Sequence, residues 1–144
     1  MDELNQQMKV CLASTFSFYL KAHNFHWNVE GPNFNDYHAF FGGLYAELWA
    51  AVDVFAEQIR ALDAYSPGSL KRFSELSVIQ DQINVPSSRA MLIELSSDNQ
   101  KMIAELEKAF RLAEKNNKLG LSNFLQDRID IHNKHGWMLK ATSK

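Results

Sequence analysis

Residues 33–62, NFNDYHAFFGGLYAELWAAVDVFAEQIRAL, decide how the chain is expected to fold. Asn33 or Asn35 can cap a helix at the start of this stretch, and Asp36 lies favourably in its first turn. The stretch predicts one long helix that runs to about Leu62. Apolar side chains recur in it at intervals of three and four, which is the spacing of one helix face: Phe41, Tyr45, Trp49, Val52, Ala56 and Ile59.

The residues before this helix predict another one. It ends near Gly31-Pro32, a pair that breaks helices. Its apolar stripe has the same three-and-four spacing: Leu4, Met8, Cys11, Thr15, Phe18, Ala22 and His26.

Two more long helices are expected further along the chain. The third begins at Ser87 or Ser88, either of which is a good cap, and it is expected to end in the run 115–118 followed by Gly120. The sequence contains no strand alternation, internal repeat or low-complexity tract. The fourth helix has a stripe of its own: Leu121, Leu125, Ile129, His132 and Leu139.

Connection lengths predict how these helices are arranged. The first and second are joined tightly, as are the third and fourth, so each pair is expected to be antiparallel. The connection over residues 63–86 is long enough to run the length of a bundle and make the second and third helices parallel, with a short helix at Leu70–Leu76 inside it. We therefore predict an all-α, ferritin-like four-helix bundle with a short helix in the long crossover, forming a single domain over residues 1–144.

Bulk composition narrows the function classes. The chain has 144 residues, a formal net charge of -2 and a sequence pI near 6.2, so its charge gives no overall reason to bind nucleic acid. Its one cysteine, Cys11, lies on an apolar stripe and is expected to be buried and inert. The start lacks the features of a signal peptide, and we see no apolar run long enough to cross a membrane. A soluble, cytoplasmic protein with no membrane partner is expected.

Three side chains of the second helix are of types that bind metals: His38, Asp53 and Glu57. Around the helix axis His38 and Asp53 are about 60° apart and Asp53 and Glu57 about 40° apart, so all three lie on one side. Along the axis, however, His38 and Asp53 are about 22 Å apart, too far to share an ion. A second, antiparallel copy of the helix, related by a two-fold axis between Phe41 and Trp49, would place His38 of one chain beside Asp53 and Glu57 of its mate, twice.

His26, near the end of the first helix, can join His38 from the same chain. Two imidazoles and two carboxylates suit ferrous iron and also zinc. The alternative is structural: a histidine on an apolar stripe is usually packed, and carboxylates four residues apart usually form a solvated helix edge. Asp53 favours a metal site, because it interrupts an apolar run without a basic neighbour. No Glu is followed by His three residues later, which disfavours a di-iron site inside one bundle.

The sequence closely resembles the Dps family, the mini-ferritins also called DNA-binding proteins from starved cells. The resemblance is dense from Lys21 to Leu62 and returns in the last helix. Its most specific part is the His-Trp-Asn-Val-x-Gly-Pro run with His, Asp and Glu at these spacings. The matching segments are KAHNFHWNVEGPNF at 21–34, His38, Leu44-Tyr45, Val52-Asp53, AEQIRAL at 56–62, His132, Lys134 and WMLKA at 137–141.

This resemblance implies a dodecameric shell, built from two-fold dimers, with ferroxidase sites shared at the dimer interfaces. It identifies His26 and His38 with the family's histidine ligands, and Asp53 and Glu57 with carboxylate ligands from the neighbouring subunit. Trp27 matches a tryptophan beside the site that can donate electrons. The implied activity is oxidation of Fe(II), preferably by hydrogen peroxide, followed by storage of Fe(III) in the hollow shell and protection against oxidative damage. Iron is thus the expected metal, and zinc is expected to fit the same ligands.

The sequence departs from the family pattern in two places. Many members carry an acidic residue one turn after the second histidine, where this chain has Gly42, so binding of a second iron is open. Glu47 lies too far along the helix to be an obvious substitute for that acid. His23, one turn before His26, could assist in its place, but it is rather expected to be a surface residue or to lie behind the ligands. In the family, acidic residues near the start of the last helix often line iron-entry pores, and the acids of that region here are Glu114, Asp127 and Asp130.

Two other functions remain open at this point. The shell could mainly coat and compact DNA, with incidental metal binding, but the sequence shows no lysine-rich tail and we expect weak or no DNA binding. The chain could also be a helical interaction protein without a metal, against which the four matched ligands argue.

Overall fold

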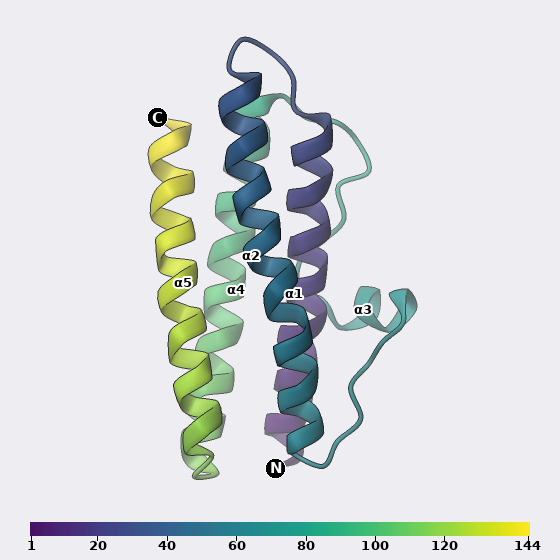
Figure 1. Cartoon of the computed structure of the whole chain (residues 1–144). Coiled ribbons are helices and arrows are strands. Elements are labelled where there is room, and N and C mark those ends of the chain that lie inside the picture. The colour runs from purple at the N-terminus through teal and green to yellow at the C-terminus, as the bar shows by residue number, and fades with distance from the viewer.

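A computed structural model describes all 144 residues as five helices without a strand. The all-α bundle and the short helix predicted from the sequence are confirmed. Four long helices lie along one another, and the short helix lies outside them in the crossover (Figure 1). In chain order the helices are α1 (Asp2–Asn28), α2 (Phe34–Ala61), α3 (Leu70–Leu76), α4 (Ser88–Lys115) and α5 (Leu119–Ser143).

The topology is that of a bundle with one long crossover. Helices α1 and α2 form an antiparallel pair, as do α4 and α5, while the connection from α2 climbs the outside of the bundle so that α2 and α4 run in the same direction (Figure 1). This is the ferritin-like arrangement. It matters for function because it leaves one long side of α2 without a neighbour in the chain.

Helix ends follow local chemistry, with two differences from the sequence prediction. Ser87 caps α4 as expected, accepting a hydrogen bond from the Ala90 amide at 3.2 Å. Asn33 stands at the start of α2, but its side chain makes no capping bond. Helix α4 ends before Gly120, because Asn117 adopts a left-handed conformation with φ of 55°, and Gly120 lies inside the first turn of α5.

The core is a continuous apolar layer drawn from all four long helices. Leucine, methionine and phenylalanine dominate it, and burying each such side chain contributes about 1.5–3 kcal/mol relative to exposure. The stripe predicted for the first helix is buried from Leu4 to Ala22, but the one predicted for α2 is partly wrong. Trp49 is exposed and Tyr45, Val52 and Ala56 are only half-buried, because the core face of α2 is made by Phe41, Leu44, Leu48, Ala51, Phe55 and Ile59. The buried thiol of Cys11 has a pKa raised to about 12, first by burial and then by Glu105. The largest fully buried side chains include Phe18, Phe25, Phe41, Phe55, Leu4, Met8, Leu12 and Leu48.

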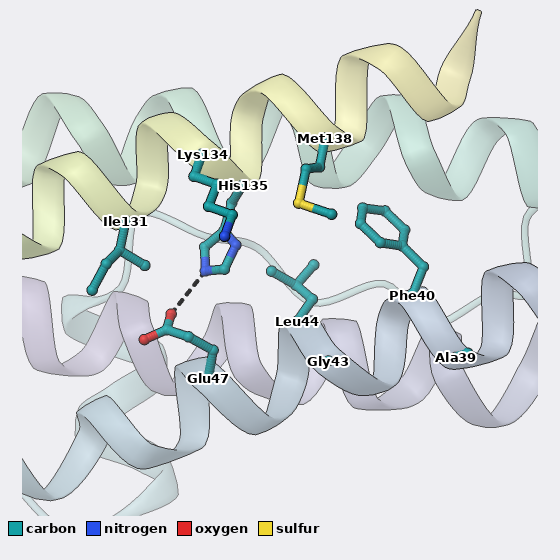
Figure 2. A pocket seen from close by; sticks show the side chains of 9 residues that line it. All are labelled: Ala39, Phe40, Gly43, Leu44, Glu47, Ile131, Lys134, His135 and Met138. Atoms are coloured by element: carbon teal, nitrogen blue, oxygen red, sulfur yellow. Dashed lines mark hydrogen bonds and ion pairs between the residues drawn. The ribbon is translucent and has the colours of Figure 1, made fainter.

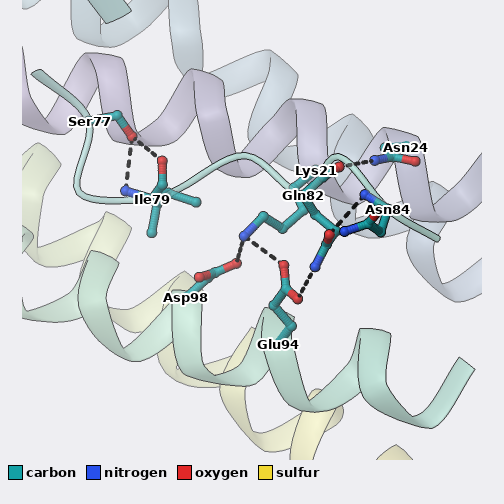
Figure 3. Close-up of polar contacts among 8 residues, drawn as sticks. All are labelled: Lys21, Asn24, Ser77, Ile79, Gln82, Asn84, Glu94 and Asp98. Atoms are coloured by element: carbon teal, nitrogen blue, oxygen red, sulfur yellow. Dashed lines mark hydrogen bonds and ion pairs between the residues drawn. The ribbon is translucent and has the colours of Figure 1, made fainter. Parts of the chain in front are cut away.

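A polar network around the buried Lys21 joins α1, α4 and the crossover (Figure 3). Lys21 of α1 is 5% exposed, and its Nζ lies 2.8 Å from Asp98 Oδ2 and 2.9 Å from Glu94 Oε2, both on α4. Gln82 of the crossover donates to Glu94 Oε1 at 2.8 Å, and the Asn24 amide donates to the Gln82 carbonyl at 3.3 Å. These bonds hold the crossover against α1 and α4, close to the end of α1 that carries His26.

Helix α2 is apolar yet poorly covered within the chain. Its most apolar 18-residue window has a mean hydropathy of 1.3, and only 28% of that window is buried. By length and composition the helix could cross a membrane, contrary to the sequence expectation, but core helices of soluble proteins pass the same test. Trp49 is 55% exposed and Val54 39%. A helix with these properties needs a covering surface.

Candidate metal centre

His26 and His38 hold each other in place through the backbone. His26 is near the end of α1 and His38 is in the second turn of α2, and the tight connection at Gly31-Pro32 brings the two turns together. The Nδ1 of His26 lies 2.7 Å from the carbonyl oxygen of His38, and the Nδ1 of His38 lies 2.6 Å from the carbonyl oxygen of His26. The two rings stack with centroids 3.7 Å apart and planes at 18°.

This reciprocal pairing assigns the tautomer of both rings. A carbonyl oxygen can only accept, so each Nδ1 must carry a proton and donate it. In a neutral imidazole the other nitrogen then has a free lone pair, so the Nε2 atoms of His26 and His38 are both available as ligands. Metal-binding histidines commonly donate their second N–H to a backbone carbonyl, which fixes the ring and raises its basicity.

Gly42 leaves the space in which the His26 ring lies. A Cβ at this position would come within 3.2 Å of both Cε1 and Nδ1 of His26. At Gly43, by contrast, an added Cβ would meet nothing within 4 Å. The missing side chain one turn after His38 is therefore part of how the two rings pack, and a bulkier residue there would push the His26 ring.

Aromatic rings surround the histidine pair on the α1 side. His23 stacks on Tyr45 with centroids 3.8 Å apart and planes at 6°, and the ring centroid of Trp27 lies 3.9 Å from that of His23. Burial, and next to it the charge of His26, lowers the pKa of His23. His23 thus lies behind the pair, one of the two places expected for it, while Trp27 remains 58% exposed.

Asp53 and Glu57 lie on the open side of α2, far from the histidines of their own chain. Both are exposed, and the hydrogen bond and the charge of Asp53 raise the pKa of Glu57. Nothing in the chain neutralises this pair. No group of three His, Cys, Asp or Glu side chains within the chain is arranged to hold a metal ion. The fold therefore unites His26 with His38 and leaves the two carboxylates apart from them, as helix spacing predicts for a single chain.

The sequence analysis missed a second polar cluster, between α2, α4 and α5. Arg128 is 4% exposed, and its Nη1 and Nη2 both donate to the carboxylate of Glu47, the latter at 3.1 Å. His135 Nε2 lies 2.8 Å from the same carboxylate (Figure 2). Burial raises the pKa of Glu47, but the hydrogen bonds from His135 and Arg128 outweigh it and bring the pKa down to about 2. The only sequence signal was a histidine, His132, on an apolar stripe.

A groove lies beside this cluster (Figure 2). It has a volume of about 470 Å³, and Glu47 and His135 are among the residues that line it. Small residues on α2 make room for it, and apolar side chains from both helices form its walls. Its other lining residues are Ala39, Phe40, Gly43, Leu44, Ile131, Lys134 and Met138. The acids considered for pores, Glu114, Asp127 and Asp130, are all exposed and form no ion pair in the chain.

The fold and the histidine pair agree with the family and the relatives that the chain matches. Its whole length, residues 1–144, matches the ferritin-like domain family, and it therefore belongs to that family. Within it the chain is a Dps-family mini-ferritin. It is 31% identical to DNA protection during starvation protein 2 of Bacillus anthracis, over 98% of this chain and 94% of that one, and 32% identical to the Brevibacillus brevis DNA protection during starvation protein, over 96% and 90%.

Solved structures show the same likeness. Dps from Staphylococcus aureus superposes with a TM-score of 0.95 at 30% identity, covering 100% of this chain and 97% of that one. Dps from Vibrio cholerae superposes with a TM-score of 0.95 at 26% identity, covering 99% and 90%, and is described as a member of a broad superfamily of ferritin-like diiron-carboxylate proteins.

Proposed function

We propose that this protein oxidises ferrous iron and stores the ferric product, with one oxidation site made by two chains. The observation that carries the proposal is the reciprocal pairing of His26 and His38, which leaves two Nε2 lone pairs free and side by side. Two neutral imidazoles alone bind ferrous iron weakly, and carboxylates complete a suitable set. Asp53 and Glu57 of a second chain are the proposed source.

The uncovered side of α2 supports a shared site. The helix is apolar but mostly unburied, and its exposed carboxylate pair has no cation to neutralise it. An antiparallel copy of α2 would cover the apolar surface. Because His38 and Asp53 of one chain are about 22 Å apart along the axis, it would also place each carboxylate pair beside the histidines of the other chain. A ferrous ion there would relieve the repulsion between Asp53 and Glu57. The same helix would then account for both assembly and chemistry.

The proposed reaction uses hydrogen peroxide as oxidant. Two ferrous ions each give one electron, peroxide takes up two electrons and two protons, and two ferric ions and two waters result. Because the two ferrous ions supply both of the electrons that reduce peroxide to water, no hydroxyl radical is released. His26, His38 and the partner carboxylates hold the ferrous substrate, and Trp27 is proposed as an auxiliary electron donor beside the site. Zinc is expected to compete for the same ligands.

In the proposed assembly a single domain over residues 1–144 forms two-fold dimers, and these build a hollow dodecamer in the cytoplasm. The Vibrio cholerae relative's description as a diiron-carboxylate protein supports iron as the metal. Sedimentation would test the assembly directly: a particle about twelve times the chain mass is expected, and a stable monomer would contradict it.

Mixing two inactive variants tests the shared site. His38→Ala chains and Asp53→Ala chains should each fail to oxidise iron when assembled alone. In a co-assembled equal mixture, half of the dimers are hybrids, and each hybrid holds one intact site, with its histidines from the Asp53→Ala chain and its carboxylates from the His38→Ala chain. About a quarter of the wild-type rate should therefore return.

The alternative predicts a different result. If each site belonged to one chain, every site in the mixture would be broken and no activity would return. Glu107→Ala, which removes an exposed carboxylate from α4, is the matched control and should keep the wild-type rate of ferric absorbance. Full activity in Asp53→Ala assembled alone would end the proposal.

A further inference from the structure

The cluster around the buried Arg128, beside the groove, has the composition of a metal site with a guanidinium at its centre. Glu47, His132 and His135 are a carboxylate and two imidazoles, a set typical of divalent transition-metal centres. All three lie around the same guanidinium or its carboxylate partner. Arg128 Nη2 is 3.1 Å from Glu47 Oε1 and 3.0 Å from His132 Nε2, and His135 Nε2 is 2.8 Å from that same Glu47 oxygen.

His132 is oriented as a metal-binding histidine would be. It is fully buried, and its Nδ1 lies 2.8 Å from the side-chain oxygen of Asn99, while the amide nitrogen of Asn99 donates to the His132 carbonyl at 2.8 Å. The Asn99 oxygen can only accept, so Nδ1 carries the proton and Nε2 presents its lone pair to Arg128. An imidazole held by one nitrogen and free at the other is the arrangement found behind metal ligands.

The position of the guanidinium is energetically unfavourable in one respect. Arg128 is 4% exposed, and its Nε, also buried, has no hydrogen-bond partner. An arginine side chain is always protonated in proteins, so it brings a permanent positive charge to Glu47 and the two histidines. A divalent ion and a guanidinium within a few ångströms would repel strongly in this poorly solvated place. The two cations therefore exclude each other.

We propose that Arg128 acts as a built-in cation that closes a Glu47–His132–His135 site to divalent metals. While the arginine is present, these three side chains bind no metal, and iron is directed to other ligands. Without it, the three side chains would take a divalent first-row ion such as Fe²⁺, Co²⁺ or Zn²⁺. His135 now donates through Nε2 to the Glu47 carboxylate, so it would release that proton, or move it to Nδ1, to present a lone pair to the ion. The proposal goes beyond the iron-oxidising function and stands independently of it.

Cobalt binding tests this in a background without the histidine pair. The parent is the full chain with His26→Ala and His38→Ala, so that failure of the proposed oxidation site has no bearing on the result. Adding Arg128→Ala should give about one Co²⁺ per chain, with the visible absorption of cobalt bound by imidazole and carboxylate. The parent should bind none at the same concentration. A further Glu47→Gln change should abolish the absorption.

Competition and refolding make every outcome informative. Methylguanidinium should displace cobalt from the Arg128→Ala chain, because it restores the missing group, whereas methylammonium at the same concentration should not. If the Arg128→Ala chain unfolds without metal, Co²⁺ or Zn²⁺ should restore its helical circular dichroism. A folded Arg128→Ala chain without bound cobalt, a chain that no metal restores, or cobalt binding that survives Glu47→Gln would each overturn the proposal.

Discussion

Acid should destabilise this protein through His132. Burial, and next to it the positive charge of Arg128, lowers the pKa of His132 well below its ordinary value of 6.5. In the unfolded chain the same imidazole titrates at its ordinary pKa. As the pH falls through 6.5, the unfolded state therefore gains a proton that the folded state does not. Because the unfolded state then binds more protons, the free energy of unfolding decreases toward acid.

The size of the effect follows from one proton. Each pH unit below 6.5 over which folded His132 stays neutral costs about 1.4 kcal/mol of the free energy of unfolding. Above pH 6.5 the histidine contributes no slope. Urea unfolding followed by circular dichroism, at fixed protein concentration because assembly also stabilises the fold, gives the free energy at each pH.

Two variants separate His132 from other groups. His132→Gln keeps a side chain that can donate to Asn99 and accept from Arg128 but cannot titrate, so its stability should be lower at neutral pH and its acid slope flatter by about one proton. His23→Gln, which removes a less buried histidine, should keep most of the slope. If His132→Gln shows the same pH dependence as the wild type, the assignment of a neutral, buried His132 is wrong.

Three further changes have definite outcomes. Gly42→Ala should weaken cobalt binding at the histidine pair by about tenfold, because its methyl group would press on the ring of His26, while Gly43→Ala should bind normally; equal titration curves would refute the steric argument. Cys11 should not react with an aromatic disulfide reagent in the native protein and should react fully in urea, since its thiol is buried with a pKa of about 12; fast native labelling would contradict this. Lys21→Met should cost about 3–5 kcal/mol in urea unfolding because it leaves the buried carboxylate of Asp98 without its cation, and a loss below about 1 kcal/mol would show that this carboxylate is solvated.

Much of the fold was predictable because it depends on local periodicity. Apolar spacing located the four long helices, and the length of the connection over residues 63–86 predicted the crossover. Helix ends were harder. Gly120 is the stronger terminator by type, yet Asn117 adopts the left-handed conformation that ends α4, because an asparagine also tolerates positive φ.

The candidate site was predictable only in part. His26 and His38 were expected to meet, since a tight connection joins their helices, and the fold brings them together. That each would bond to the other's carbonyl could not be read from the residues, because it depends on how α1 and α2 pack. The contribution of Asp53 and Glu57 from a second chain remains a prediction, since helix spacing supports it and a single chain does not test it.

By itself the sequence determined the helices, their order and the identity of the candidate ligands, because each is encoded within a few residues of chain. Tertiary structure alone decided the buried cluster, in which Arg128 and Glu47 are 81 residues apart and meet through the packing of α5 against α2. Glu47 looks like an ordinary surface acid on its own helix. Only tertiary packing brings His135 and Arg128 to it, and their hydrogen bonds lower the pKa of that carboxylate against the opposing effect of burial.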